Sequence, residues 1–92
     1  MSYKLELTGQ AESHLMEWKK SGRKKILLKI ACLLEEITLH PRTGSGHVEP
    51  LKGDLSGFWS RRIDKGSRIV YKIDDDKVLV TIISMRKHYS DK

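Results

Sequence analysis

The first forty residues carry apolar side chains mostly at helical spacing. The stretch "YKLEL" alternates polar and apolar residues and predicts a short first strand. A short amphipathic helix is predicted next, because Thr8 can cap its start and Ser21-Gly22 can end it. After Arg23 a second helix of about four turns is predicted from a broad apolar stripe. The stripe consists of Ile26, Leu27, Ile30, Ala31, Leu33, Leu34 and Ile37.

The second half of the chain changes to a β pattern. His40-Pro41 disfavours further helix, and the glycine-containing stretch that follows predicts an exposed loop continuing through "HVEPLKGDLSG". The β-branched and aromatic runs "FWSRRID", "SRIVYKID" and "KVLVTIISM" are separated by "KG" and "DDD", which suit tight hairpin turns. We therefore predict an α+β fold in the order β-α-α-β-β-β. Two N-terminal helices should pack on a twisted, mainly antiparallel sheet of about four strands.

Alternation along the strands predicts which side chains share a face of the sheet. In the strand from Ser67 to Asp74, Ile69, Tyr71 and Ile73 are expected under the helices, which leaves Arg68, Val70 and Lys72 on the other face. By the same rule Arg62 shares a face with Phe58 and Ser60. Trp59 is expected in the core or at its rim.

Length and composition indicate one small domain. Ninety-two residues suffice for a single two-layer core, so we predict one domain over residues 1–92. The N-terminus lacks the basic and apolar regions of a secretory signal, and no run approaches the about 20 apolar residues of a membrane span, which predicts a soluble cytoplasmic protein. The single cysteine, Cys32, lies within the apolar helical pattern and is interpreted as a small core residue.

Basic residues are concentrated in two stretches. Eighteen Lys and Arg against twelve Asp and Glu give a formal net charge of +6. One stretch, from Lys19 to Lys29, has six basic residues and no acid, and the other runs from Lys52 to Lys72. Such a balance indicates a polyanionic partner, either nucleic acid or an acidic protein, although many proteins carry a solvated basic face without one.

The segment "EPLKGDLSGFWSRRIDKGSRIVYKI", followed after one more strand by "HY", carries a family resemblance. Its motifs are Glu-Pro-Leu-Lys, Leu-Ser-Gly-Phe-Trp-Ser-Arg-Arg-Ile, an Arg-Ile-Val-Tyr strand and a final His-Tyr, over residues 49–89. In order and spacing this segment resembles the YoeB/Txe group of the RelE superfamily. The resemblance implies the RelE-like fold and the toxin of a type II toxin–antitoxin system. It also implies a ribosome-dependent endoribonuclease that cleaves messenger RNA in the ribosomal A site.

The same resemblance implies a set of site residues. Glu49 matches the general base, Arg68 a charge-stabilising arginine and His88 the general acid, while Lys52, Arg62 and Tyr89 match substrate-binding positions. These residue types suit RNA cleavage by a ribose 2′-hydroxyl, which needs a base, donors for the phosphoryl oxygens and an acid. Taken alone, each has a simpler interpretation as a solvated charge, a surface ion pair or an exposed terminal histidine.

Partners and alternatives also follow from the resemblance. It implies messenger RNA on the ribosome, with the basic stretch from Lys19 to Lys29 suited to ribosomal RNA. Further implied partners are a YefM/Axe-like antitoxin, operator DNA through the antitoxin complex only, and a second copy in a homodimer, with no membrane. No cofactor or metal is expected, because the histidines and Cys32 show no usual ligand spacing.

This chain continues beyond the His-Tyr pair with Ser90, Asp91 and Lys92, which raises the question whether this tail alters the acid's surroundings. Two alternatives remain open. One is a non-catalytic basic module that inhibits by occupying RNA or the ribosome, and the other is an endoribonuclease acting on free RNA.

Overall fold

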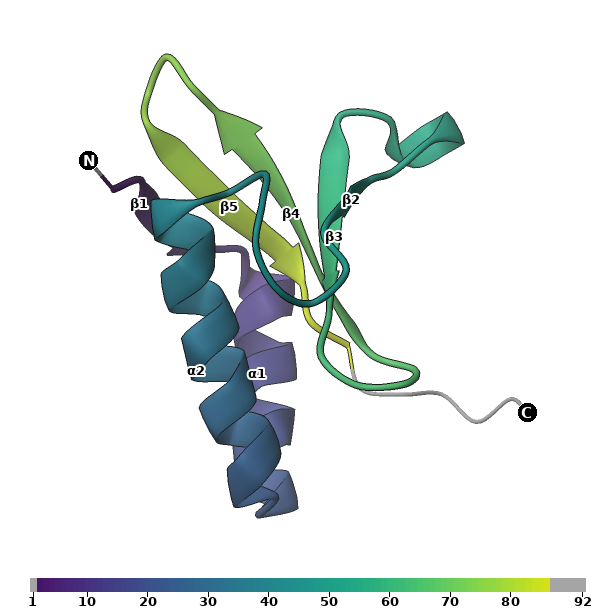
Figure 1. Cartoon of the computed structure of the whole chain (residues 1–92). Coiled ribbons are helices and arrows are strands. Elements are labelled where there is room, and N and C mark those ends of the chain that lie inside the picture. Colours follow the sequence, from purple (N-terminus) through teal and green to yellow (C-terminus); the bar gives the residue numbers. More distant parts are fainter. Residues whose placement is uncertain (1, 87–92) are drawn as a thin grey trace.

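A computed structural model describes residues 2–86 of the chain. Its elements follow the order β1 (Lys4–Leu7), α1 (Gly9–Ser21), α2 (Lys24–Leu39), β2 (Glu49–Pro50), the 3-10 helix η1 (Gly53–Leu55), β3 (Phe58–Arg62), β4 (Arg68–Asp74) and β5 (Leu79–Ser84). Figure 1 shows α1 and α2 side by side against the sheet. The predicted α+β fold is confirmed, with helices and strands in the predicted order.

The ends of α1 are set by the residues that the sequence indicated. Thr8 accepts a hydrogen bond from the backbone N–H of Ala11, and this satisfies one donor of the first turn. At the other end Gly22 takes the left-handed conformation at φ 72° and donates its N–H to the Lys19 carbonyl. Because that conformation is strained for residues with a side chain, the glycine allows the sharp turn into α2.

The described strands form one sheet in the order β1-β5-β4-β3-β2. β1 is parallel to β5, and the other neighbouring pairs are antiparallel. The described sheet therefore has one strand more than the predicted total of about four, because the stretch expected to be loop contains the two-residue strand Glu49–Pro50. Two residues are too few for a periodic signal, and this strand forms only because β3 offers it a ladder.

The core lies between the helices and one face of the sheet, which we call the helix face. Ile69 and Tyr71 of β4 are fully buried there, as alternation predicted, and Ile73 and Trp59 pack at the margin of the core. The other core residues are Ala11, Trp18, Ile30, Leu33, Ile37, Ile63, Val80, Ile82 and Met85. We call the opposite side the open face, because neither helix packs against it (Figure 1).

The interpretation of Cys32 as a core residue was wrong. Its side chain is exposed, because the buried positions of α2 are Ile30, Leu33 and Ile37. At about 100° per residue, Cys32 lies roughly 200° around the helix from Ile30 and therefore points away from the core. The apolar stripe of the sequence is wider than the face that the sheet covers, and Leu28 on the outer side remains 67% exposed.

Candidate functional site

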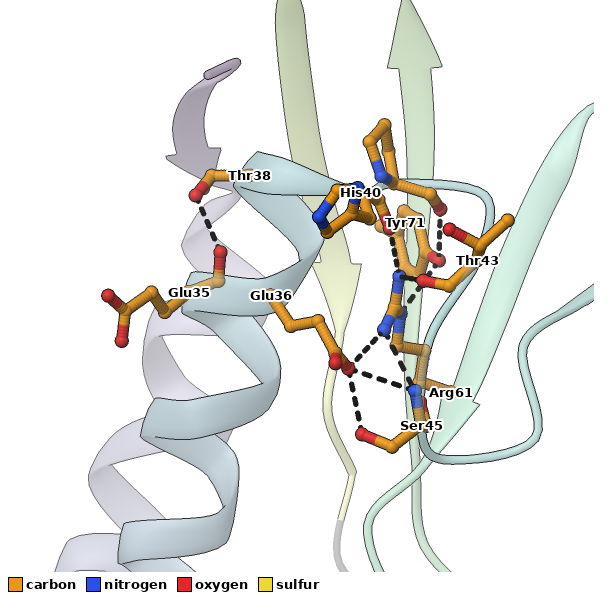
Figure 2. Close-up of polar contacts among 9 residues, drawn as sticks. Glu35, Glu36, Thr38, His40, Thr43, Ser45, Arg61 and Tyr71 are labelled. Carbon is orange, nitrogen blue, oxygen red and sulfur yellow. Dashed lines mark hydrogen bonds and ion pairs between the residues drawn. The ribbon is translucent and has the colours of Figure 1, made fainter. Parts of the chain in front are cut away.

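The loop that leads from α2 to Glu49 is held in place by Arg61. This side chain is fully buried on the helix face, and its guanidinium donates to the Glu36 carboxylate, with Nη1 2.7 Å from Oε1. Its Nε donates to the Tyr71 hydroxyl at 3.1 Å. Figure 2 shows the guanidinium enclosed by the loop. The backbone carbonyls that also accept from it belong to His40, Thr43 and Ser45.

Further polar contacts complete this network. The Tyr71 hydroxyl donates to the Pro41 carbonyl at 2.7 Å, and burial raises the pKa of this phenol. Ser45 donates both its backbone N–H and its hydroxyl to Glu36, and these hydrogen bonds, together with the Arg61 charge, lower the pKa of the Glu36 carboxyl. A charged pair and a neutral tyrosine therefore fasten the loop to β3 and β4.

Gly46 lets the loop approach β3 closely. Its carbonyl accepts the N–H of Arg62, and its φ of 89° is in the left-handed region. A Cβ at this position would lie 3.2 Å from both the Arg62 carbonyl and a Leu33 methyl carbon. Only glycine combines this φ with this closeness, so Gly46 sets the distance at which the chain enters β2.

β2 then presents Glu49 on the open face. Glu49 is paired with Ser60 of β3, and Pro50 is paired with Trp59. Directly opposed residues of an antiparallel pair point to the same side of the sheet. Because Trp59 packs against the core, Glu49 is directed to the opposite face together with Ser60.

The two predicted site arginines meet on this open face. Arg62, the last residue of β3, is directly opposite Arg68, the first residue of β4. The Glu49 carboxylate lies beside them, with Oε1 3.7 Å from Arg68 Nη1. The side chains of Glu49 and Arg68 are 55% and 50% exposed, and Arg62 is exposed as well. The structure thus brings Glu49, Arg62 and Arg68 together.

This arrangement is suited to an anionic ligand. Two like charges directly opposed across strands repel each other, and a single carboxylate at 3.7 Å balances only part of their charge. An ion pair between half-exposed groups contributes little to stability, so a ligand can displace it at low cost. Paired guanidinium groups offer several donors that match phosphate oxygens.

The other predicted site residues are Lys52, His88 and Tyr89. Lys52 is exposed and follows β2, immediately before η1. His88 and Tyr89 lie outside the described residues. The basic stretch that suggested a polyanionic partner also includes Arg61, whose charge is buried and neutralised rather than offered to a ligand.

Basic residues also gather where α1 turns into α2. The six basic residues between Lys19 and Lys29 are all exposed. A cleft of about 380 Å³ lies between Arg23 and the β3–β4 turn, where Asp64, Lys65 and Gly66 line it. Within residues 2–86, no three His, Cys, Asp or Glu side chains are grouped closely enough to hold a metal ion. In the same part of the chain no helix is long and apolar enough to cross a membrane.

Sequence reasoning did not single out two polar contacts at the end of β5. His14 Nδ1 accepts the backbone N–H of Met85 at 3.1 Å, and Trp18 Nε1 donates to the Met85 carbonyl at 2.6 Å. Both side chains lie within the predicted amphipathic helix, but the residues that they contact are 71 and 67 positions away. The helical interval from His14 to Trp18 was the available signal, since it places both side chains on one face of α1.

Comparison with known proteins agrees with this architecture. The family described as "YoeB-like toxin of bacterial type II toxin-antitoxin system" matches residues 8–89. The chain is 42% identical to Toxin YoeB of Streptomyces coelicolor over 86 residues, which is 94% of this chain and 99% of that protein. It is 43% identical to Toxin YoeB of Escherichia coli K12 over 72 residues, covering 78% of this chain and 82% of that protein.

Solved structures give the same answer. A YoeB/ParE toxin from Agrobacterium tumefaciens superimposes with a TM-score of 0.85 at 34% identity, covering 94% of this chain and 99% of that one. A YoeB-YefM complex and a YoeB dimer, both from Staphylococcus aureus, give TM-scores of 0.78 and 0.77 at 33% identity, each over 95% of this chain and 98% of theirs. The chain therefore belongs to the YoeB-like toxins of bacterial type II toxin–antitoxin systems.

Proposed function

We propose that this toxin is a ribosome-dependent, metal-independent endoribonuclease that cleaves messenger RNA in the ribosomal A site of the bacterial cytoplasm. The observation that carries the proposal is the group on the open face. There Arg62 is directly opposite Arg68, and the Glu49 carboxylate lies 3.7 Å from the Arg68 guanidinium. A module that only bound RNA would need the cations and would gain nothing from the carboxylate beside them.

Each residue has a defined role in the proposed reaction. Glu49 accepts the proton of the ribose 2′-hydroxyl as that oxygen attacks the adjacent phosphorus. Arg68 and Arg62 donate to the phosphoryl oxygens while negative charge builds up on them. His88, which follows the end of β5 closely in the sequence, protonates the departing 5′-oxygen. Lys52 and Tyr89 bind the flanking RNA.

Substrate binding activates the base in this scheme. In the free toxin the Glu49 carboxylate is partly neutralised by Arg68. When the scissile phosphate enters between Arg62 and Arg68, it takes the Arg68 donors and releases the carboxylate to accept a proton. Since both side chains are about half exposed, this exchange requires rotamer changes only and no rearrangement of the sheet.

The sharpest test is primer extension on ribosomes programmed with a single message. Wild-type toxin should cut the message within the A-site codon. Cutting should persist when a chelator removes transition metals and leaves the magnesium that the ribosome needs. The expected ends are 2′,3′-cyclic or 3′-phosphate. Glu49→Ala and His88→Ala should each lower the single-turnover rate by about 10²–10⁴-fold, and Arg68→Ala by about 10²–10³-fold.

Matched controls come from the β4–β5 turn, at the far end of β4 from Arg68. Lys77→Ala and Asp76→Ala each remove one exposed charge there and should leave the rate unchanged. Full cleavage by folded Glu49→Ala, Arg68→Ala and His88→Ala variants would disprove the mechanism. Translation arrest without RNA cuts would favour inhibition by occupancy, and equally fast cutting of naked message would favour an enzyme of free RNA.

We further propose a YefM-like antitoxin as the partner of this chain, because YoeB relatives of the same fold occur in a YoeB-YefM complex. An acidic segment would lie over Arg62 and Arg68 and compete with RNA for them. Reversing either charge should weaken the complex, and the complex rather than the free toxin should bind operator DNA. A homodimer is expected by analogy with the Staphylococcus aureus YoeB dimer, and sedimentation velocity would measure it.

A further inference from the structure

Side chains of α1 continue the hydrogen bonding of β5 beyond the end of β1. β1 ends at Leu7, which is paired with Ile82. The next residue, Thr8, donates its backbone N–H to the Ile82 carbonyl and its hydroxyl to the Ile83 carbonyl, both at 3.0 Å. After Ser84, the last residue of β5, the chain no longer pairs with β1, but side chains of α1 still bond to its backbone.

Met85 is held at both of its backbone polar groups. Its N–H donates to His14 Nδ1 at 3.1 Å, and its carbonyl accepts from Trp18 Nε1 at 2.6 Å. Met85 and Trp18 are 0% and 1% exposed, and His14 is 8% exposed. Buried backbone groups need partners, and here two side chains one helical turn apart provide both. We call this arrangement the Met85 anchor.

The anchor lies next to the candidate site. Val70, two residues from Arg68 on β4, is paired with Ser84, which directly precedes Met85. His88 follows Met85 by three residues, and three residues span at most about 11 Å. Backbone that has left a sheet is held in place only if other groups bond to it. The hydrogen bonds to Met85 therefore fix the chain three residues before His88, directly after the residue that pairs with Val70 of β4.

From this geometry we propose that His14 and Trp18 are positioning residues for cleavage, which hold the end of β5 so that His88 reaches the scissile phosphate that Arg68 binds. This inference rests on the proposed nuclease function. Neither side chain touches RNA in this role, and both act through the Met85 backbone. The toxin thus uses its first helix to set the position of a proton donor about seventy residues further along the chain.

Substitutions can remove single hydrogen bonds from the anchor. Trp18→Phe keeps an aromatic ring but removes the donor, and Trp59→Phe is its matched control, because Trp59 is packed against the core at another place. His14→Leu removes the acceptor. His14→Asn restores one, since the asparagine side-chain oxygen takes approximately the place of Nδ1. Every variant should first show cooperative unfolding. Amide hydrogen exchange at Met85 should be faster in His14→Leu and Trp18→Phe, which each remove a hydrogen bond, than in His14→Asn and Trp59→Phe.

The decisive measurement is the single-turnover cleavage rate on saturated ribosomes, with ribosome affinity measured separately. His14→Leu and Trp18→Phe should lower the rate by about 10–10²-fold with unchanged affinity, since small misplacements of reacting groups have effects of this size. His14→Asn and Trp59→Phe should stay near the wild-type rate. In a His88→Ala background, Trp18→Phe should lower the rate no further, because the group that it positions is already gone.

The outcomes separate the two proposals. If wild-type toxin does not cut programmed ribosomes, the nuclease proposal fails and the positioning role fails with it. If wild-type toxin cuts and the folded Trp18→Phe and His14→Leu variants cut equally fast, only the positioning role is overturned. An equal loss in the wild-type and His88→Ala backgrounds would also overturn it, because the anchor would then serve general stability alone.

Discussion

Arg61 and Arg62 are adjacent and chemically identical, yet they lie on opposite faces of β3. Arg61 is fully buried in the network that fastens the loop before Glu49, whereas Arg62 is exposed beside Arg68. Replacing each with alanine removes the same side chain and the same charge from the same strand. We therefore expect Arg61→Ala to impair stability and Arg62→Ala to impair cleavage.

The size of the stability loss can be worked from the contacts. The Arg61 guanidinium donates five hydrogen bonds, one to the Glu36 carboxylate, one to the Tyr71 hydroxyl and three to loop carbonyls. At a net 0.5–1.5 kcal/mol each, five such bonds contribute about 2.5–7.5 kcal/mol. Because Glu36 is 32% exposed, water can solvate its carboxylate once the guanidinium is gone, so no further penalty for an unpaired buried charge is added. The middle of the range, about 5 kcal/mol, is roughly the lower limit of a small domain's whole stability.

Thermal unfolding monitored by circular dichroism would measure this loss. In a domain of this size each kcal/mol shifts Tm by roughly 4–8 °C, so Arg61→Ala should melt at least about 10 °C below wild type. Arg62→Ala should stay within about 0.5 kcal/mol of it. Arg61→Lys should fall between them, since an ammonium group keeps the charge but cannot reach five acceptors in a planar fork.

The result that would refute this reasoning is an equal Tm for the two alanine variants. It would mean that water replaces the guanidinium among the loop carbonyls without loss. Primer extension on the same two proteins provides the complementary comparison. Below the melting temperature of Arg61→Ala, that variant should retain more cleavage than Arg62→Ala, whose substitution removes a donor from the candidate phosphate site.

Three further predictions concern individual groups. Hydrogen bonds from Ser45 and the Arg61 charge lower the pKa of Glu36, so this group stabilises the fold above its unfolded pKa near 4.5. The contribution is lost as pH falls through the lowered folded pKa. In urea unfolding from pH 7 to pH 2, the free energy of unfolding should therefore fall less in Glu36→Gln than in wild type. Ser67→Ala should raise Tm or leave it unchanged, because Ser67 Oγ is buried without a hydrogen-bond partner among the described residues, and a lowered Tm would show an unseen one. Arg42 donates to Asp75 at 2.8 Å and, with Tyr3, lowers the pKa of the Asp75 carboxyl. The NMR titration midpoint of Asp75 should therefore lie below 3.8 and should rise in Arg42→Ala. An unchanged midpoint in that variant would contradict the pairing.

Features with local physical causes could be predicted from the sequence. The bounds of α1 follow from a capping threonine and a left-handed glycine, and the three β-runs follow from their composition and turns. Alternation within β4 was enough to predict that Arg68 points away from the helices. The pairing of Arg68 with Arg62 could not be predicted in the same way, because it depends on the register of β3. Glu49 could be named only through its family motif, because a lone glutamate before proline has no structural signature.

Features that depend on distant partners could not be predicted. Cys32 was predicted to be buried because it lies in an apolar stretch, but the width of that stretch does not determine how much of the helix the sheet covers. Nothing near Arg61 in the sequence indicates that Glu36 will reach it across 25 positions. The Met85 anchor joins residues about seventy positions apart, and a two-residue strand such as β2 exists only because β3 lies beside it.

The register of β3 determines which arginine serves the fold and which can serve the site. A slip by one residue would exchange the faces of all its side chains, and the two arginines alone would hardly resist it, since either could enter the loop network. Their apolar neighbours do resist it. Trp59 and Ile63 share the helix face with Arg61. A slip would turn both away from the core and turn the polar side chains of Ser60 and Asp64 toward it. Hydrophobic burial at Trp59 and Ile63 is therefore what directs Arg62 toward Arg68 and makes an anion site on the open face possible.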